Sequence, residues 1–398
     1  MSRCRVLPSL TRKIIDDVAF PLGAYPVEEM TPRTGYTLTF EPADGDDQDG
    51  DWEEWPDRYV FDIFVSAVRV EPLCRALLAM LPGRFYPILD VLGHDEYREV
   101  DPYVAYELIS QERFLDAIRR YRGYFYEDGL VGFGAMSEEP FVYVFVDEHK
   151  IVTVRVQADM RERVERLLTA FDLPEVEEIA GADAATHEHR GVLDAPDDRM
   201  DLLTADEIVE ELRNEWGLVL NIDPDTNVDD DGNELGITGW RCLARHEVIT
   251  DLPGGEGEAK QGGERASGDA AGGSPGPEPR YAEVLLTADS IAGAERLLWE
   301  GMHQLTGKKS SGPGSMTDPG EPEEGREGGE GGDSVDTAIA LDRVTPESFK
   351  ELLASASEPK AASAPGGGAP AAPVPASKKP ADDVDMSESK VWHVRWLS

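Results

Sequence analysis

Residues 130–168, LVGFGAMSEEPFVYVFVDEHKIVTVRVQADMRERVERLL, decide the fold class of this protein. The runs FVYVFV and IVTVRV are rich in β-branched and aromatic residues, and the four residues DEHK separate them. This pattern predicts two antiparallel strands joined by a tight turn. Asp159 and Glu162 have the spacing of a capping box, so we expect a helix to begin there. Its apolar residues recur at helical intervals, at Val164, Leu167, Leu168 and Phe171.

Residues 281–298, YAEVLLTADSIAGAERLL, share this pattern. VLLTAD…ERLL matches VRVQAD…ERLL in its strand, its helix-boundary dipeptide and its helix end, and each copy has a predicted helix upstream, shortly before the tripeptide GLV. A helix, three antiparallel strands and a helix therefore occur twice, which indicates an internal duplication. Chance similarity is the alternative, because such short motifs are common at helix boundaries. We expect an α+β fold in which antiparallel sheets carry helices on one face.

Composition divides the chain of 398 residues into folded parts and connectors rich in Gly, Pro and acidic residues. Such connectors bury too little apolar surface to fold, so we expect them to be disordered. We predict a first α+β domain over 1–180 and a second over 181–306, with a flexible insertion at 253–280. Beyond them we predict a disordered linker, a short helix, a second disordered linker rich in Ala and Pro, and an aromatic strand-like tail, at 307–337, 338–356, 357–389 and 390–398.

The chain is strongly acidic, with a net charge of -42 from 80 acidic and 38 basic residues. This charge argues against unaided binding to nucleic acid, which needs clustered Lys and Arg, and against binding to an anionic membrane surface. No apolar run is long enough to span a membrane, and the N-terminal segment lacks the apolar core of a signal peptide. Cys4, Cys74 and Cys242 are too far apart in sequence to indicate a disulfide framework. We therefore expect a soluble, cytoplasmic protein.

The acidic stretch 223–234, DPDTNVDDDGNE, is the first candidate binding site. Read from its first residue as a calcium loop, it has oxygen-bearing side chains at the ligating positions, at Asp223, Asp225, Asn227, Asp231 and Glu234. The position that needs Gly is Val228, and no shifted register restores both the Gly and the final Glu. The flanking segments GLVLNI and LGITGWRCL predict strands, so a hairpin tip is the preferred interpretation and calcium binding the alternative.

Two further segments gather histidines and carboxylates. In THEHR, His187 and His189 would point to the same face of a strand, as a pair of metal ligands can require, but no third ligand is identifiable, so exposed histidines in a loop are the preferred interpretation. In GHDEYREVDPY, His94, Asp95 and Glu96 follow a predicted strand, where acid–base chemistry is an alternative to a polar turn. No complete phosphate-binding, zinc-protease or serine-hydrolase motif is present. We expect no cofactor beyond a weakly held divalent cation.

The C-terminal segment KVWHVRWLS alternates apolar and polar residues, with Trp392, Val394 and Trp396 on one face of a predicted strand. Exposed tryptophans are unfavourable, so we expect this segment to dock. It would add a strand either to its own sheet or to the sheet of a protein partner.

The predicted order of elements is similar in outline to that of acidic bacterial secretion chaperones and related regulators, in which a helix, three antiparallel strands and a helix recur. This resemblance implies a protein-binding role and rests on the fold alone. Because no coherent catalytic set is evident, we expect a non-catalytic interaction, regulatory or chaperone-like module. The alternatives are a metal-assisted hydrolase that uses the histidine and carboxylate clusters, and a weak calcium-binding protein.

Overall fold

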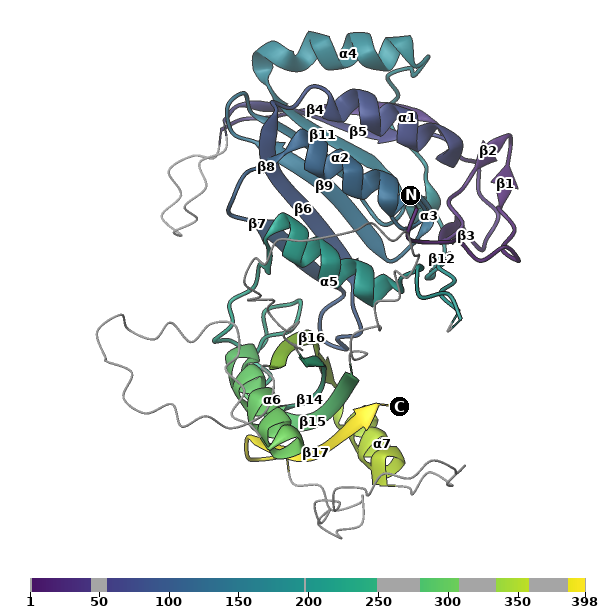
Figure 1. Ribbon diagram of the computed structural model, residues 1–398. Coiled ribbons are helices and arrows are strands. Elements are labelled where there is room, and N and C mark those ends of the chain that lie inside the picture. Colours follow the sequence, from purple (N-terminus) through teal and green to yellow (C-terminus); the bar gives the residue numbers. More distant parts are fainter. Residues whose placement is uncertain are drawn as a thin grey trace, which may run out of the picture. The chain divides into compact units, whose positions relative to one another are not determined.

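The computed structural model divides the chain into two compact units (Figure 1). Unit 1 comprises residues 1–93 and 99–222, and unit 2 comprises residues 94–98 and 223–398. Within them the structure describes residues 2–43, 56–196, 198–248, 280–307, 334–357 and 386–397. The expected insertion at 253–280, apart from its last residue, and most of the expected linkers at 307–337 and 357–389 lie outside the described residues.

Unit 1 is built on a nine-stranded antiparallel sheet with the order β13-β7-β6-β9-β10-β11-β5-β4, to which β8 adds by pairing with β6. Its strands are β4 (Gly35–Glu41), β5 (Arg58–Phe64), β6 (Arg84–Leu92), β7 (Val100–Ala105), β8 (Ile109–Ser110), β9 (Val131–Ser137), β10 (Val142–Val146), β11 (Val152–Gln157) and β13 (Leu218–Leu220). The predicted hairpin is confirmed, because β10 pairs antiparallel with β11.

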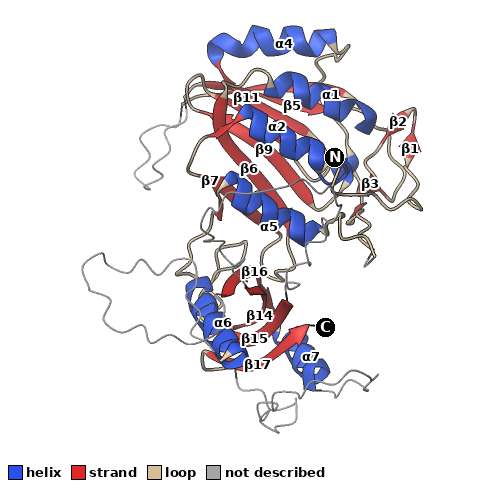
Figure 2. Cartoon of the chain, viewed as in Figure 1, coloured by secondary structure: helices blue, strands red, loops and turns tan. Residues whose placement is uncertain are grey.

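The helices of unit 1 share one apolar core with this sheet, and α1, α2 and α5 lie across the same face of it (Figure 2). The helices are α1 (Ala67–Leu78), α2 (Gln111–Arg120), α3 (Arg122–Glu127), α4 (Arg161–Ala170) and α5 (Ala205–Trp216). Helix α4 follows a single 3-10 turn, η1 (Ala158–Met160), and no side chain caps its start. The capping role expected of Asp159 is therefore wrong, and its carboxylate instead accepts a hydrogen bond from Gln157.

Short strands near the N-terminus form two small sheets of unit 1. Strand β1 (Ile14–Ile15) pairs with β2 (Val18–Ala19). Strand β3 (Ala24–Pro26) pairs antiparallel with β12 (His187–His189), which follows the 3-10 turn η2 (Ala182–Ala184). The second pairing joins two parts of the chain that are far apart in sequence, and it carries two of the candidate ligands.

Unit 2 contains a four-stranded antiparallel sheet with the order β16-β14-β15-β17. Its elements are β14 (Thr238–Val248), β15 (Arg280–Ala288), α6 (Ile291–Thr306), β16 (Ser334–Val344), α7 (Pro346–Ser357) and β17 (Lys390–Leu397). Helix α6 packs on the cluster that contains Val284, whereas Phe349 of α7 packs on the neighbouring Leu285. Adjacent residues of a strand point to opposite faces, so the two helices cover opposite faces and the expectation of helices on one face is wrong for unit 2.

Two expected boundaries differ from the structure. The predicted domain boundary at residue 180 moves to 222, because α5 and β13 belong to the core and sheet of unit 1. The segment 338–356, predicted as a helix, is strand β16 as far as Val344 and becomes helical only from Pro346. Pairing with β14 overrides the helical preference of its Ala and Leu residues.

The internal duplication is not confirmed. In the first copy β9, β10 and β11 are neighbours in one sheet, whereas the corresponding strands of the second copy are divided between two sheets. Residues 221–237 consequently connect β13 of one sheet to β14 of another, so the expected hairpin between these two strands does not form. The acidic stretch is nevertheless a turn, closed by an antiparallel bridge between Val228 and Glu234. The fold is nevertheless mixed α+β with antiparallel sheets, as predicted. Among the described residues, no helix combines the length and apolarity needed to cross a membrane.

Candidate metal centre

Three histidine side chains of unit 1 converge through their Nε2 atoms. The Nε2 of His149 lies 3.0 Å from that of His187 and 3.1 Å from that of His189. The three rings meet edge to face, with centroids 4.6–4.8 Å apart. The predicted pair on one strand is thus joined by a third histidine from the turn between β10 and β11.

The alternation of side chains along β12 places His187 and His189 on the same side of the strand. In β12, His187 pairs with Pro26 and His189 with Ala24, while the intervening Glu188 points to the other side. The Glu188 carboxylate accepts a 2.7 Å hydrogen bond from the Tyr25 hydroxyl. Both imidazoles of β12 therefore lie on one side of the strand. The Glu188 carboxylate, between them in sequence, lies on the other side.

The turn at 147–150 presents His149. The amide of Lys150 donates to the Asp147 carbonyl at 3.1 Å, and the Asp147 carboxylate accepts the amide hydrogen bond of Ile151 at 2.7 Å. Lys150 has a left-handed backbone, with φ of 66°. Its buried ammonium donates to the Val131 carbonyl at 2.6 Å, so the turn is anchored to β9.

Backbone carbonyls fix the tautomers of the β12 histidines. The Nδ1–H of His187 donates to the Ala185 carbonyl at 2.8 Å, and that of His189 donates to the Gly129 carbonyl at 2.7 Å. A carbonyl only accepts hydrogen bonds, so the proton of each neutral ring is assigned to Nδ1 and the lone pair to Nε2. The Nδ1 of His149 lies 3.2 Å from the Glu148 carboxylate and 3.6 Å from that of Asp147, which favours the same tautomer.

Three Nε2 lone pairs facing one another repel unless a cation lies among them. Zinc–nitrogen bonds of about 2.0–2.1 Å in a tetrahedral arrangement place the nitrogens about 3.3 Å apart. The observed separations of 3.0 and 3.1 Å reach that geometry with small outward movements of the rings. A single proton on His149 would satisfy one of these two contacts and leave the other without a hydrogen, so a metal ion fits the arrangement better.

The surroundings of His149 and His189 shift the pKa values of these two side chains in opposite directions. Burial lowers the pKa of His149, but the neighbouring carboxylates, foremost Asp147 and Glu148, outweigh burial and hold it above its ordinary value. Burial, together with the two other rings, holds the pKa of His189 below its ordinary value. The carboxylates thereby make the His149 imidazole a more basic donor, and burial favours the neutral, ligating form of His189.

A close backbone crossing positions the carbonyl that holds His189. Gly23, Gly129 and Arg190 are joined by hydrogen bonds, with the Gly129 amide donating to Arg190 at 3.1 Å and the Arg190 amide donating to Gly23 at 2.8 Å. A Cβ atom on Gly129 would lie 2.0 Å from the Gly23 carbonyl oxygen. The crossing therefore requires glycine at both positions.

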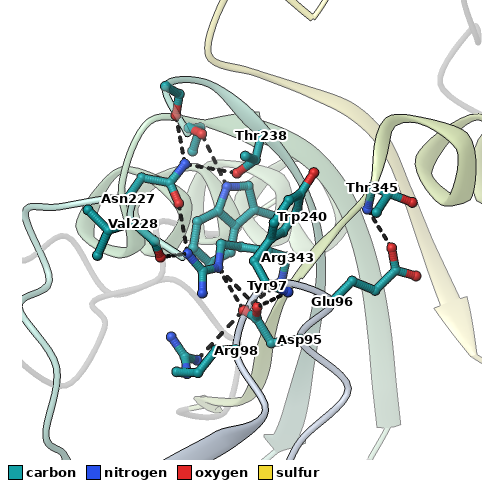
Figure 3. Close-up of polar contacts among 12 residues, drawn as sticks. Asp95, Glu96, Tyr97, Arg98, Asn227, Val228, Thr238, Trp240, Arg343 and Thr345 are labelled. Carbon is teal, nitrogen blue, oxygen red and sulfur yellow. Dashed lines mark hydrogen bonds and ion pairs between the residues drawn. The ribbon is translucent and has the colours of Figure 1, made fainter. Parts of the chain in front are cut away.

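The acidic stretch 223–234 does not gather its side chains around one point. The Asp223 carboxylate accepts the Asp225 amide hydrogen bond, and the Asp229 carboxylate accepts from Asn233. Asn227 accepts from Arg343 at 3.1 Å and donates to the Gly236 carbonyl (Figure 3). Asp231 and Glu234 are exposed, and within the described residues no three potential ligands of this stretch lie close together.

The predicted acid–base candidates form a structural network in unit 2. Buried Asp95 pairs with buried Arg343, whose Nε lies 2.9 Å from the carboxylate (Figure 3). The Glu96 carboxylate accepts the Thr345 amide hydrogen bond at 2.6 Å at the start of α7. Hydrogen bonds from Thr345 and Ser348 outweigh the burial that opposes them and hold the pKa of Glu96 below its usual range. His94 is exposed and lies outside this network.

The aromatic tail docks within its own chain, as strand β17 beside β15. The pairing skips one residue, because Leu285 faces His393 and Leu286 faces Val391. The resulting bulge turns Trp392 towards α7, while Val394 and Trp396 pack on the α6 side. The three residues therefore do not share the single face that their alternation predicted.

His149 and Gly129 are the site residues that the sequence pattern did not identify. The usable signal for His149 was a histidine flanked by acids in a tight turn, but nothing in the sequence relates that turn to β12. Comparisons with protein-family models, with curated proteins and with solved structures found no match to this chain.

Proposed function

We propose that this protein binds a divalent transition-metal ion, of the zinc class, through His149, His187 and His189. The Nε2 atoms of His187 and His189 lie 3.0 and 3.1 Å from that of His149, and this convergence of three lone pairs carries the proposal. Imidazole nitrogen suits zinc, copper, nickel and cobalt, whereas calcium and magnesium prefer oxygen. The nearby carboxylates act as hydrogen-bonding partners of the ligand, a common feature of zinc sites.

The donor set favours zinc among these metals. It supplies three neutral nitrogens, no thiolate and a geometry close to tetrahedral, which suits an ion with no preferred d-electron geometry. Three free, buried thiols, at Cys4, Cys74 and Cys242, support a reducing, cytoplasmic setting for the protein.

Titration of metal-free protein with zinc tests the proposal, with calorimetry as the readout. We expect one ion per chain and a loss of affinity in His149→Ala, His187→Ala and His189→Ala. Each loss should exceed the roughly 10–100-fold effect typical of residues that only support a ligand.

His94→Ala is the matched control, because it removes an exposed histidine outside the cluster. Its zinc affinity should equal that of the parent protein. Unchanged affinity in the three ligand variants would refute the proposed metal centre.

A further inference from the structure

We infer that the metal ion of the three-histidine centre is a hydrolytic catalyst, with water at its fourth position and an uncharged carboxylic ester as its substrate class. This inference rests on the proposed function and adds an activity to it. The number of protein donors, their access to solvent, their net charge and the surrounding electrostatics support it independently of one another.

The donor count separates catalytic from structural zinc. Structural sites are closed by four protein ligands, whereas catalytic sites have three and keep one position open. Across the described part of the chain, the cluster of His149, His187 and His189 has no fourth His, Cys, Asp or Glu member. A second group combines His149 with Asp147 and Glu148, but these carboxylates lie at its Nδ1, away from the converging Nε2 atoms.

The three histidines are partly exposed. All three are only partly buried, and the His149 side chain keeps 13% of its surface exposed. We therefore place the open position of the ion towards solvent. The ligands themselves are fixed in advance, since two rings are held by backbone carbonyls and the third by its own tight turn.

Neutral ligands leave the full charge of the ion in place. Three imidazoles carry no negative charge, so a divalent ion retains its ability to acidify a bound water, whose pKa falls to about 7 in comparable zinc sites. Four thiolates would cancel that charge. The donor set thus favours water activation over a purely structural role.

The electrostatic surroundings limit the substrate. Asp147, Glu148 and Asp183 all lie close enough to His149 to act on its charge. These carboxylates repel an anionic substrate such as a phosphate monoester. An uncharged ester meets no such repulsion, so the ion would act on its carbonyl group.

The reaction needs no co-reactant besides water. The metal-bound water releases a proton to the solvent, and its oxygen forms a bond to the carbonyl carbon. The bond from that carbon to the ester oxygen breaks, and the alcohol leaves after taking a proton. The acid product leaves as a carboxylate, so one ester and one water give one alcohol, one carboxylate and one proton.

Cobalt-substituted full-length protein allows the metal centre and its open position to be tested separately. Cobalt binding alone, followed by its visible spectrum, tests the proposed function. Addition of imidazole at alkaline pH, where it is an uncharged metal ligand, then tests the open position, and we expect a saturable change in that spectrum. If cobalt binds and imidazole leaves the spectrum unchanged, the site is closed and the inference fails while the metal centre stands; if cobalt does not bind, both fail.

Hydrolysis by zinc-loaded protein tests the activity and the substrate class. We expect p-nitrophenyl acetate to be cleaved at least about tenfold faster than by metal-free protein, and p-nitrophenyl phosphate to show no such gain. The gain should vanish in His187→Ala and persist in His94→Ala. Equal rates with and without zinc, or a phosphate ester preferred over the acetate, would overturn the inference.

Discussion

At the scale of single residues, the metal centre depends on groups that do not touch the ion. Gly129 supplies the carbonyl that orients His189, and its own position is fixed by the crossing with Gly23. Lys150 occupies the left-handed position of the turn that carries His149. Substitutions at these residues should therefore change the orientation of the histidine ligands without touching the ion.

Gly129→Ala should destabilise unit 1 and weaken zinc binding. The added Cβ would lie 2.0 Å from the Gly23 carbonyl, so the backbone must shift, at a cost of about 1–3 kcal/mol. Urea unfolding and zinc titration measure the two effects. Gly83→Ala is the control, because a Cβ there meets nothing within 4 Å. Equal stability of the two variants would contradict the predicted clash.

Lys150 should give the protein a distinctive pH dependence. Its side chain is 1% exposed, and burial lowers its pKa from 10.5 to about 8. Between those values the unfolded chain binds a proton that the folded chain has released, so the free energy of unfolding should rise with pH across this window. Below it, the buried charge costs on the order of 3 kcal/mol.

Lys150→Met removes this titration and keeps a side chain of similar length. The difference in unfolding free energy between parent and variant should increase in favour of the parent as the pH rises from about 8 to above 10. Urea unfolding at several pH values measures it. Parallel pH profiles for the two proteins would show that Lys150 does not titrate in this range.

At the scale of elements, unit 2 depends on contacts between segments that are far apart in sequence. The segment 94–98 contributes Asp95 to Arg343 of β16, and Glu96 to the start of α7. The strand β17 completes the sheet and both of its apolar clusters. The ion pair and the docked strand can each be tested by substitution.

Asp95→Ala should strongly destabilise unit 2. It leaves Arg343, which is 3% exposed, buried without its main countercharge, and such losses cost about 3–5 kcal/mol. The double variant Asp95→Leu with Arg343→Met should recover part of this loss, because it also removes the buried charge. Thermal unfolding measures both proteins. A double variant that is less stable than Asp95→Ala would argue against a charge effect.

Removal of one aromatic side chain from β17 should also destabilise unit 2. Trp396 packs on the apolar cluster that includes α6 residues such as Leu298. The guanidinium carbon of Arg280 lies 3.9 Å from the centre of the Trp396 ring. Trp396→Ala should lower the free energy of unfolding by about 2–4 kcal/mol, whereas Leu397→Ala, at a position 37% exposed, should change it by less than about 1 kcal/mol. Similar melting temperatures for the two variants would mean that the tail is not docked in solution.

At the scale of the whole molecule, the two units should respond differently to metal. All three candidate ligands belong to unit 1, so an ion bound there stabilises that unit by mass action, by about 2.7 kcal/mol at a concentration 100 times the dissociation constant. Unit 2 contains no ligand of this centre.

Hydrogen exchange followed by mass spectrometry can resolve this difference within one chain. Zinc should slow exchange in β12, in its partner β3 and in the 147–150 turn, and should leave β14 to β17 unchanged. His187→Ala should abolish the protection. Uniform protection of both units would contradict a centre confined to unit 1.

Features that depend on neighbouring residues could be predicted from the order of the amino acids alone. Alternation of apolar residues predicted the β10–β11 hairpin and the strand at the C-terminus, and it placed His187 and His189 on one face. These are local consequences of the two-residue period of a strand, so they follow from a few consecutive positions. The α+β class follows from the same patterns.

The contacts between distant segments become known only from the folded chain. His149 joins His187 across 38 residues because β12 pairs with β3 near the 147–150 turn, and many strands share the same period without any mark of their partners. The same reason explains the position of β13 in unit 1, the strand at 334–344 and the bulge that turns Trp392 away from Trp396. Pairing partners and bulges depend on packing between segments, and short-range patterns do not encode them.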